Sequence, residues 1–207
     1  MQGPMVVYFM RIARIAAAVA AIATAPIAAA KADVYVFDPA HTSITFSWNH
    51  VGLSRQSGRI LEFEGTLDFD PLAPEQANVD VTLKVASLFT GFAQLDRDLR
   101  SSDFFDAARY PFITFRSTGV TKTGERTGEV AGDLTIMGQT HPAVLQVRWN
   151  FTGEHPLAEL NPGYKGKFVS GFSAVASIMR SQWGIKRAIP LVPDEIEISI
   201  EAEFLRK

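Results

Sequence analysis

The feature that most constrains the fold is a strict alternation of apolar and acidic residues near the end of the chain, in residues 195–204. Successive side chains of a β-strand point to opposite faces, so this run predicts a strand with one dry face and one wet face. Residues 61–69 repeat the pattern. The residues predicted to face inward are Ile196, Ile198, Ile200, Ala202 and Phe204 in the first run and Leu61, Phe63, Leu67 and Phe69 in the second.

Strand-like runs separated by turn residues cover nearly all of the chain after residue 33. We predict strands at 34–50 with a bend at Pro39, 59–70, 78–87, 112–121, 128–137, 142–151, 167–179 and 195–205. Short connections favour antiparallel pairing, and eight long strands avoid exposed edges most simply by closing. The sequence therefore predicts an all-β protein, an eight-stranded antiparallel β-barrel. A two-layer sandwich is the alternative.

One segment, residues 89–108, breaks the strand pattern. Leu95 and Leu99 share one helical face within it. We expect a short helical segment that crosses one mouth of the barrel.

The first residues are typical of an export signal. Arg11 and Arg14 precede an uncharged Ala/Ile/Val run that ends in small residues. We predict a signal peptide at residues 1–32, cleaved before Asp33, and a single domain at 33–207. Cleavage after Ala30 and an uncleaved membrane anchor are the alternatives. We expect the protein to be soluble in a periplasm.

Composition excludes several classes of function. The net charge is −2 and becomes more negative without residues 1–32, which argues against a nucleic-acid partner. The chain has no cysteine, so it has no thiol nucleophile and no zinc-cysteine site. Nucleophile elbows, Ser-x-x-Lys and phosphate-binding glycine loops are missing from the sequence.

The four histidines do not form an evident metal or catalytic motif. His41 and His50 are nine positions apart, so a regular strand places them on opposite faces and too far apart to share a metal. We expect them to hydrogen-bond structurally or to a ligand headgroup rather than to catalyse. His141 and His155 precede prolines, and we expect both to be exposed in loops. We predict no catalytic residues and no metal site.

The predicted inward face carries many aromatic residues, which either fill the barrel or line a cavity; sequence patterning favours neither. If the barrel is hollow, the candidate ligand-binding residues are Ile44, Phe46, Trp48, Phe63, Leu83, Phe89, Phe92, Leu99, Phe104, Phe115, Leu134, Trp149, Phe172 and Trp183.

In the order and spacing of several short motifs, the chain resembles the YceI-like polyisoprenoid-binding family of exported, lipocalin-like barrels. The matching pieces are Asp38-x-x-His41, Phe46-x-x-x-His50-x-Gly52, Ser87-x-x-Thr90, Asp96-x-x-Leu99-Arg100-Ser101-x-Asp103-Phe104, Tyr110-Pro111 with Phe115-x-Ser117-Thr118, and Gly132-Asp-Leu-Thr135 with Gly138.

The resemblance implies a non-catalytic carrier that holds a long isoprenoid lipid or quinone in an apolar tunnel, with no other cofactor. Leu95 and Asp98 stand where family members often carry Arg and His, which removes positive charge and favours a neutral headgroup. The expected headgroup contacts are His41, His50, Arg100 and Arg180. A membrane surface or membrane redox proteins are further expected partners of a monomer or homodimer. The alternatives are an enzyme that uses His41 or His50 with Asp38 or Asp103, and an interaction module with a filled barrel.

Overall fold

The structure is a computed structural model that describes residues 32–207. The predicted signal peptide therefore lies, but for its last residue, outside the described residues, and its cleavage stays a prediction. Within residues 32–207, no helix is both long enough and apolar enough to cross a membrane.

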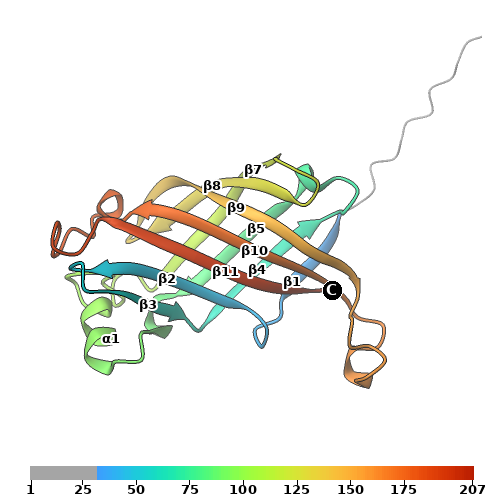
Figure 1. Cartoon of the computed structure of the whole chain (residues 1–207), viewed down its shortest axis with the longest axis horizontal. Helices are drawn as coiled ribbons and strands as arrows, with labels where there is room; N and C mark the ends of the chain where they lie inside the picture. Colours follow the sequence, from blue (N-terminus) through green and yellow to red (C-terminus); the bar gives the residue numbers. More distant parts are fainter. Residues whose placement is uncertain (1–31) are drawn as a thin grey trace, which may run out of the picture.

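The described residues form eleven strands, one α-helix and four short 3-10 helices (Figure 1). The helix is α1 (Ala93–Arg100). The strands are β1 (Asp33–Phe37), β2 (Ser43–His50), β3 (Ser54–Ile60), β4 (Phe63–Phe69), β5 (Asn78–Lys84), β6 (Leu88–Phe89), β7 (Phe112–Lys122), β8 (Thr127–Ile136), β9 (Gln139–Glu154), β10 (Phe168–Met179) and β11 (Glu195–Arg206).

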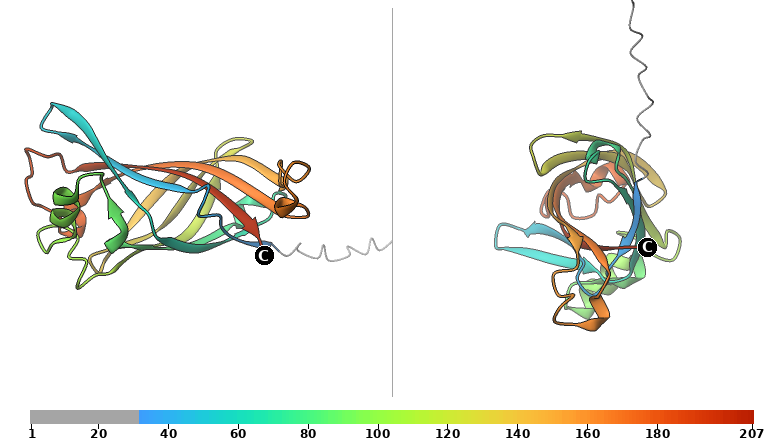
Figure 2. Two further views of the ribbon diagram at one scale, coloured as in Figure 1. Left: turned by 90° about the horizontal axis from the view of Figure 1, so that it is seen from below. Right: turned by 90° about the vertical axis from the view of Figure 1, so that its right-hand side faces the viewer.

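Strand β1 closes the sheet because it pairs with β4 on one side and with β11 on the other. The closed ring runs β1-β4-β5-β7-β8-β9-β10-β11, and every neighbouring pair is antiparallel. Figure 2 shows this ring end on in its right-hand view. The predicted fold class, an eight-stranded antiparallel barrel with a short helix at one mouth, is confirmed.

Strands β2, β3 and β6 lie outside the closed ring. β2 pairs with β11, β3 with β2 and β6 with β3. β1 and β2 lie one after the other along β11, with Phe37 opposite Phe204 and Ile44 opposite Ile200. The bend predicted at Pro39 is the point where β1 ends and β2 begins. β3 then pairs with β2 while β4 pairs with β1, so both pairs of strands follow one another along the same wall.

The predicted strand 59–70 is in fact two strands, with a break at Leu61 and Glu62. The hydroxyl oxygen of Ser87 accepts hydrogen bonds from both backbone N–H groups, at 3.2 and 2.9 Å. These bonds replace ladder pairing and end the alternation, which leaves Leu61 52% exposed. The prediction that Leu61 faces inward is wrong for this reason.

Helix α1 is attached to the barrel through buried polar contacts. The Asp96 carboxylate accepts hydrogen bonds from the Thr90 backbone N–H and hydroxyl, each at 2.7 Å. Arg100 donates to the carbonyl of Ala86 in the preceding segment, at 2.8 Å. Leu99 is buried against Ile60 and other apolar neighbours, so the helix lies across the mouth as the sequence predicted.

Candidate functional site

The barrel encloses an apolar lumen with two chambers. The narrow chamber has a volume of about 220 Å³ and lies between β4, β5 and β7 to β11. The wide chamber, of about 590 Å³, lies toward β2, β3, α1 and the loop 184–194. Five residues line both chambers, so the two lie next to each other: Ile44, Leu83, Leu134, Ile178 and Ile198.

The alternating residues of β11 form one wall of this lumen, as predicted. Ile200, Ala202 and Phe204 line the narrow chamber, Ile196 lines the wide chamber, and Ile198 lines both. Ala174 and Ala176 on the neighbouring strand β10 line the adjacent part of the wall, and their small side chains leave room in the narrow chamber.

Aromatic rings form a floor at one end of the narrow chamber. Phe69 packs edge-on against Trp149 and Phe172, with ring centroids 5.4 and 5.3 Å apart. Phe172 also meets Phe204 edge-on at 6.0 Å. All four residues line the chamber. Charged residues stand where the chamber approaches the β4–β5 and β7–β8 turns: Glu75, Lys122, Glu125 and Arg126.

Two glycines let large rings lie close to the barrel wall. A Cβ atom on Gly58 would stand 2.4 Å from the Phe46 ring, and a Cβ on Gly132 would stand 2.4 Å from the Phe115 ring. Each glycine lies on the strand next to the aromatic residue. The rings therefore occupy space over the neighbouring backbone instead of the middle of the lumen.

The wide chamber has polar side chains in its lining as well as apolar ones. His50 and Gln56 come from the β2–β3 hairpin, Gln94 and Asp98 from α1, and Arg187 from the loop 184–194. Asp98 accepts a hydrogen bond from Gln94 at 2.8 Å, and Arg187 pairs with Asp103 at 3.0 Å. The wide chamber thus has polar side chains from three separate segments in its lining, whereas the charged residues of the narrow chamber stand at its β4–β5 and β7–β8 turns.

Twelve of the fourteen predicted ligand-binding residues line one chamber or both. The narrow chamber includes Phe115, Trp149 and Phe172; the wide chamber includes Phe46, Trp48, Phe92, Leu99, Phe104 and Trp183; Ile44, Leu83 and Leu134 line both. That these residues contact a ligand stays a prediction.

The other two candidates lie outside the lining of both chambers. Phe63 packs edge-on against Phe37, with ring centroids 5.2 Å apart, because it begins β4 immediately after the break at residues 61 and 62. Phe89 is 48% exposed because β6 is only two residues long and ends at the rim of the barrel.

Of the four expected headgroup contacts, His50 and Arg180 line the wide chamber. Arg100 does not, because its guanidinium group donates to the backbone carbonyls of Ala86 and Asp96. His41 does not either, because it lies on the outside of the β1–β2 corner, described below.

Arg180 is buried, and backbone carbonyl groups occupy its guanidinium. Its Nε, Nη1 and Nη2 atoms donate four hydrogen bonds of 2.9 to 3.1 Å to carbonyl oxygens between residues 185 and 193. Burial lowers the pKa of Arg180, while nearby Asp194 opposes that shift. Arg180 therefore holds the loop 184–194 in place rather than presenting free donors to the chamber.

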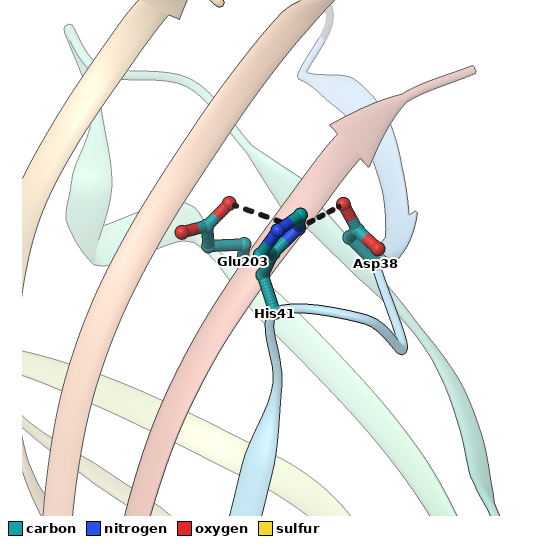
Figure 3. Close-up of side chains that lie close together, drawn as sticks. All are labelled: Asp38, His41 and Glu203. Carbon is teal, nitrogen blue, oxygen red and sulfur yellow. Dashed lines mark hydrogen bonds and ion pairs between the residues drawn. The ribbon is translucent and has the colours of Figure 1, made fainter.

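His41 meets two carboxylates at the corner between β1 and β2 (Figure 3). Its Nδ1 atom lies 2.9 Å from Asp38 Oδ2 and 3.9 Å from Glu203 Oε2. The hydrogen bond to Asp38, followed by the carboxylate charge, raises the pKa of His41. Burial raises the pKa of Asp38, but hydrogen bonds from His41 and the Ala40 N–H outweigh it and hold that pKa below its usual value.

This cluster ties the corner to β11. The Asp38 N–H donates to the Glu203 carbonyl at 2.8 Å, and the Thr42 hydroxyl exchanges hydrogen bonds with the Glu203 backbone. The ligand atoms of Asp38, His41 and Glu203 lie within 4.8 Å of one another, a spacing that suits a single divalent cation. In the structure these atoms contact one another as an ion pair.

The two remaining histidines are not the exposed loop residues that the sequence suggested. His141 lies within β9 and meets Trp183 edge-on, with ring centroids 5.3 Å apart. His155 is only 6% exposed and stacks on Tyr164 at 3.8 Å. The predicted strand 142–151 began too late, which placed His141 in a turn. His155 does follow the end of β9, as predicted, but its ring is buried instead of exposed.

Sequence reasoning missed the loop 184–194 as part of the site. Ile185, Ala188 and Val192 of this loop line the wide chamber. No apolar alternation marks it, and the residue that fixes it, Arg180, was interpreted as a headgroup contact. Gly184, Pro190 and Pro193 were the available signal, but they indicate only a turn.

Comparisons with known proteins agree with the barrel. The model of the YceI-like domain family matches residues 35–204. A UPF0312 protein from Pseudomonas savastanoi pv. phaseolicola is 36% identical over 175 residues, 84% of this chain and 86% of the relative.

Two solved structures share the fold. BcnA from Burkholderia cenocepacia has a TM-score of 0.71 at 23% identity, covering 81% of this chain and 98% of that one. A polyisoprenoid binding domain from Saccharophagus degradans has a TM-score of 0.59 at 12% identity, covering 86% and 100%. With a family model that spans nearly all of residues 32–207, the chain belongs to the YceI-like family.

Proposed function

We propose that this protein is a non-catalytic carrier or store for a lipid with an isoprenoid tail, working in the periplasm. The observation that carries the proposal is the apolar lumen of two adjoining chambers, which the described side chains line without filling. The polyisoprenoid-binding description of the Saccharophagus degradans domain, a structural neighbour, supports the isoprenoid class of ligand.

The distribution of polar groups sets the direction in which such a lipid would lie. The narrow chamber has alanines, branched aliphatic residues and an aromatic floor, which suit the tail. The wide chamber offers His50, Gln56 and Gln94, which suit hydrogen bonding to a headgroup. We therefore place the tail in the narrow chamber and the headgroup in the wide one.

The charges of the wide chamber favour a neutral headgroup such as a quinone or an alcohol. Backbone carbonyls occupy the Arg180 guanidinium, and Asp103 pairs with Arg187. Asp98 adds a negative charge to the lining. In the wide chamber a pyrophosphate would meet these groups, and both lining cations described there, Arg180 and Arg187, already have partners and are not free to compensate for its desolvation.

Burial of about ten methylene-like groups at about 0.8 kcal/mol each gives on the order of 8 kcal/mol, or roughly micromolar affinity before ordering costs. The test is mass spectrometry of an organic extract of the purified protein, together with a titration of tryptophan emission by a long-chain quinone. We expect a co-purified prenyl lipid and a saturable response from Trp48 and Trp149 in the walls. An empty extract together with no saturable response would refute the proposal.

The enzyme alternative gains no support from the site. His41 contacts Asp38, as that hypothesis required, but neither residue lines either chamber. The contact lies outside the lumen that a hydrophobic substrate would enter.

A further inference from the structure

Large apolar side chains are exposed around the mouth of the wide chamber. Leu53 is 82% exposed, Leu191 72% and Phe92 66%. Val51, Phe89 and Ile189 are exposed beside them. We call these six residues the apolar rim. Large exposed apolar residues gathered at one end of a protein are typical of a surface that contacts a membrane, another protein or a ligand.

The rim comes from three separate segments that meet at one end of the barrel. Val51 and Leu53 form the turn of the β2–β3 hairpin, Phe89 and Phe92 precede α1, and Ile189 and Leu191 lie in the loop 184–194. Figures 1 and 2 show these three segments together at the end opposite the C-terminus. Each segment also contributes lining to the wide chamber, through Gln56, Phe92 and Val192 respectively.

Phe92 connects the rim with the lumen, because it is largely exposed and also lines the wide chamber. The apolar surface therefore continues from solvent into the cavity. The other end of the lumen differs, because alternating charges stand there: Glu75, Lys122, Glu125 and Arg126. A lipid that leaves through the wide chamber would stay in contact with apolar side chains.

Exposed cations without an ion pair stand next to the rim, on α1 and on the loop 184–194. Arg97 of α1 and Lys186 of the loop are exposed and make no ion pair with the other described residues. Arg55 of β3 and Arg187 of the loop are paired with Glu197 and Asp103, and the exposed Asp98 of α1 accepts a hydrogen bond from Gln94. Apolar side chains with flanking cations are the combination that binds the interface of a bilayer with anionic lipids.

We propose that the apolar rim docks on the surface of a lipid bilayer and holds the mouth of the wide chamber against it. The proposal rests on the function proposed above and names the partner from which the lipid is taken or to which it is given. Leu53, Phe92 and Leu191 would enter the boundary between headgroups and acyl chains, while Arg97 and Lys186 face the phosphates.

The test compares two double variants of the full chain for binding to vesicles of phosphatidylethanolamine with a minority of phosphatidylglycerol. Leu53→Asp with Leu191→Asp changes the rim. Leu72→Asp with Leu160→Asp is the matched control, because these leucines are 89% and 82% exposed in turns far from the rim. None of the four side chains lines a chamber. The unaltered protein and both double variants share residues 1–31, so any difference in vesicle binding is due to the substitutions.

We expect the rim variant to bind vesicles on the order of tenfold or more weakly than the unaltered protein. The control should stay within about twofold. Binding of the unaltered protein should weaken when phosphatidylglycerol is omitted or salt is raised, because Arg97 and Lys186 lose their attraction.

Ligand binding in solution, followed by tryptophan emission, separates this proposal from the function on which it rests. Saturable quinone binding without vesicle binding, or equal losses in both double variants, would overturn docking and leave the carrier function standing. Rim-dependent self-association in sedimentation without vesicle binding would also overturn it, by making this face a contact between copies. Rim-dependent vesicle binding without any lipid uptake would support docking and refute the carrier function.

Discussion

A larger side chain in the narrow chamber should weaken the binding of long-tailed ligands much more than the binding of short-tailed ones. Ala174 is 8% exposed, lines this chamber, and lies opposite Ile200 of β11 and Val147 of β9. Ala174→Phe would place a phenyl ring in the space where we expect the tail. The neighbouring residue on β10, Val175, is 54% exposed and points outward, so Val175→Phe is the matched control.

The magnitude follows from the volume that the ring takes. A phenyl ring displaces about one five-carbon isoprenoid unit from a chamber of about 220 Å³. Five carbons at about 0.8 kcal/mol each correspond to about 4 kcal/mol of lost burial. Part of that loss is recovered if the tail bends, so we expect about 2–4 kcal/mol, a roughly 30- to 1000-fold weaker affinity.

The assay is a titration of tryptophan emission with a short prenol such as geraniol and a long one such as solanesol. Ala174→Phe should weaken solanesol binding by the factor above and change geraniol binding by less than about threefold, because the wide chamber still accommodates it. Val175→Phe should leave both unchanged. Solanesol affinity that survives Ala174→Phe, or that falls equally in Val175→Phe, would refute the placement of the tail. Circular dichroism of both variants checks that the barrel forms.

Two further predictions concern the parts that hold the barrel in shape. The raised pKa of His41 means that its pair with Asp38 contributes stability below the unfolded His value of about 6.5 and loses it as pH rises through the folded value. The lowered pKa of Asp38 means that the contribution is present above about 3.9 and lost as pH falls through the folded value. His41→Ala should therefore lower the free energy of unfolding more at about pH 5.5 than at about pH 8.5 in urea titrations, and an equal effect at both would contradict this reasoning. Arg180→Lys should lower the free energy of unfolding by about 2 kcal/mol or more, because a single ammonium group cannot satisfy the four carbonyls. The exposed Arg187→Lys should lower it by less than about 1 kcal/mol in the same assay. Similar losses in the two variants would disprove the role of Arg180 in holding the loop 184–194.

The inward face of β11 could be predicted from the sequence because it depends only on the two-residue period of a strand. Every apolar position from Ile196 to Phe204 lines the lumen. The break after Ile60 could not be predicted from the local sequence, because its cause is Ser87, which lies 26 residues beyond Leu61. Local pattern reveals which face a side chain takes, but not where a distant hydroxyl interrupts the ladder.

The sequence also left open whether the barrel is hollow. Phe46 and Phe115 had the volume to fill it, but their rings lie over Gly58 and Gly132 on the neighbouring strands. That arrangement depends on pairing register, which a single sequence does not contain. The same limitation explains why Arg180 was predicted to meet a headgroup, since its four carbonyl partners follow it by 5 to 13 residues in an irregular loop.

A hollow barrel must be stable without the contacts that a filled centre would provide. The buried apolar side chains of the described residues gather in three clusters, around Trp183 and Ile136, around Tyr35 and Phe69, and around Leu88 and Leu99. Backbone pairing between neighbouring strands connects the walls that carry these clusters. A lipid tail in the lumen would add the missing apolar contacts to the folded state alone, and a ligand that binds only the folded state raises its stability by mass action. The same space that weakens the empty barrel is therefore the source of affinity for its ligand.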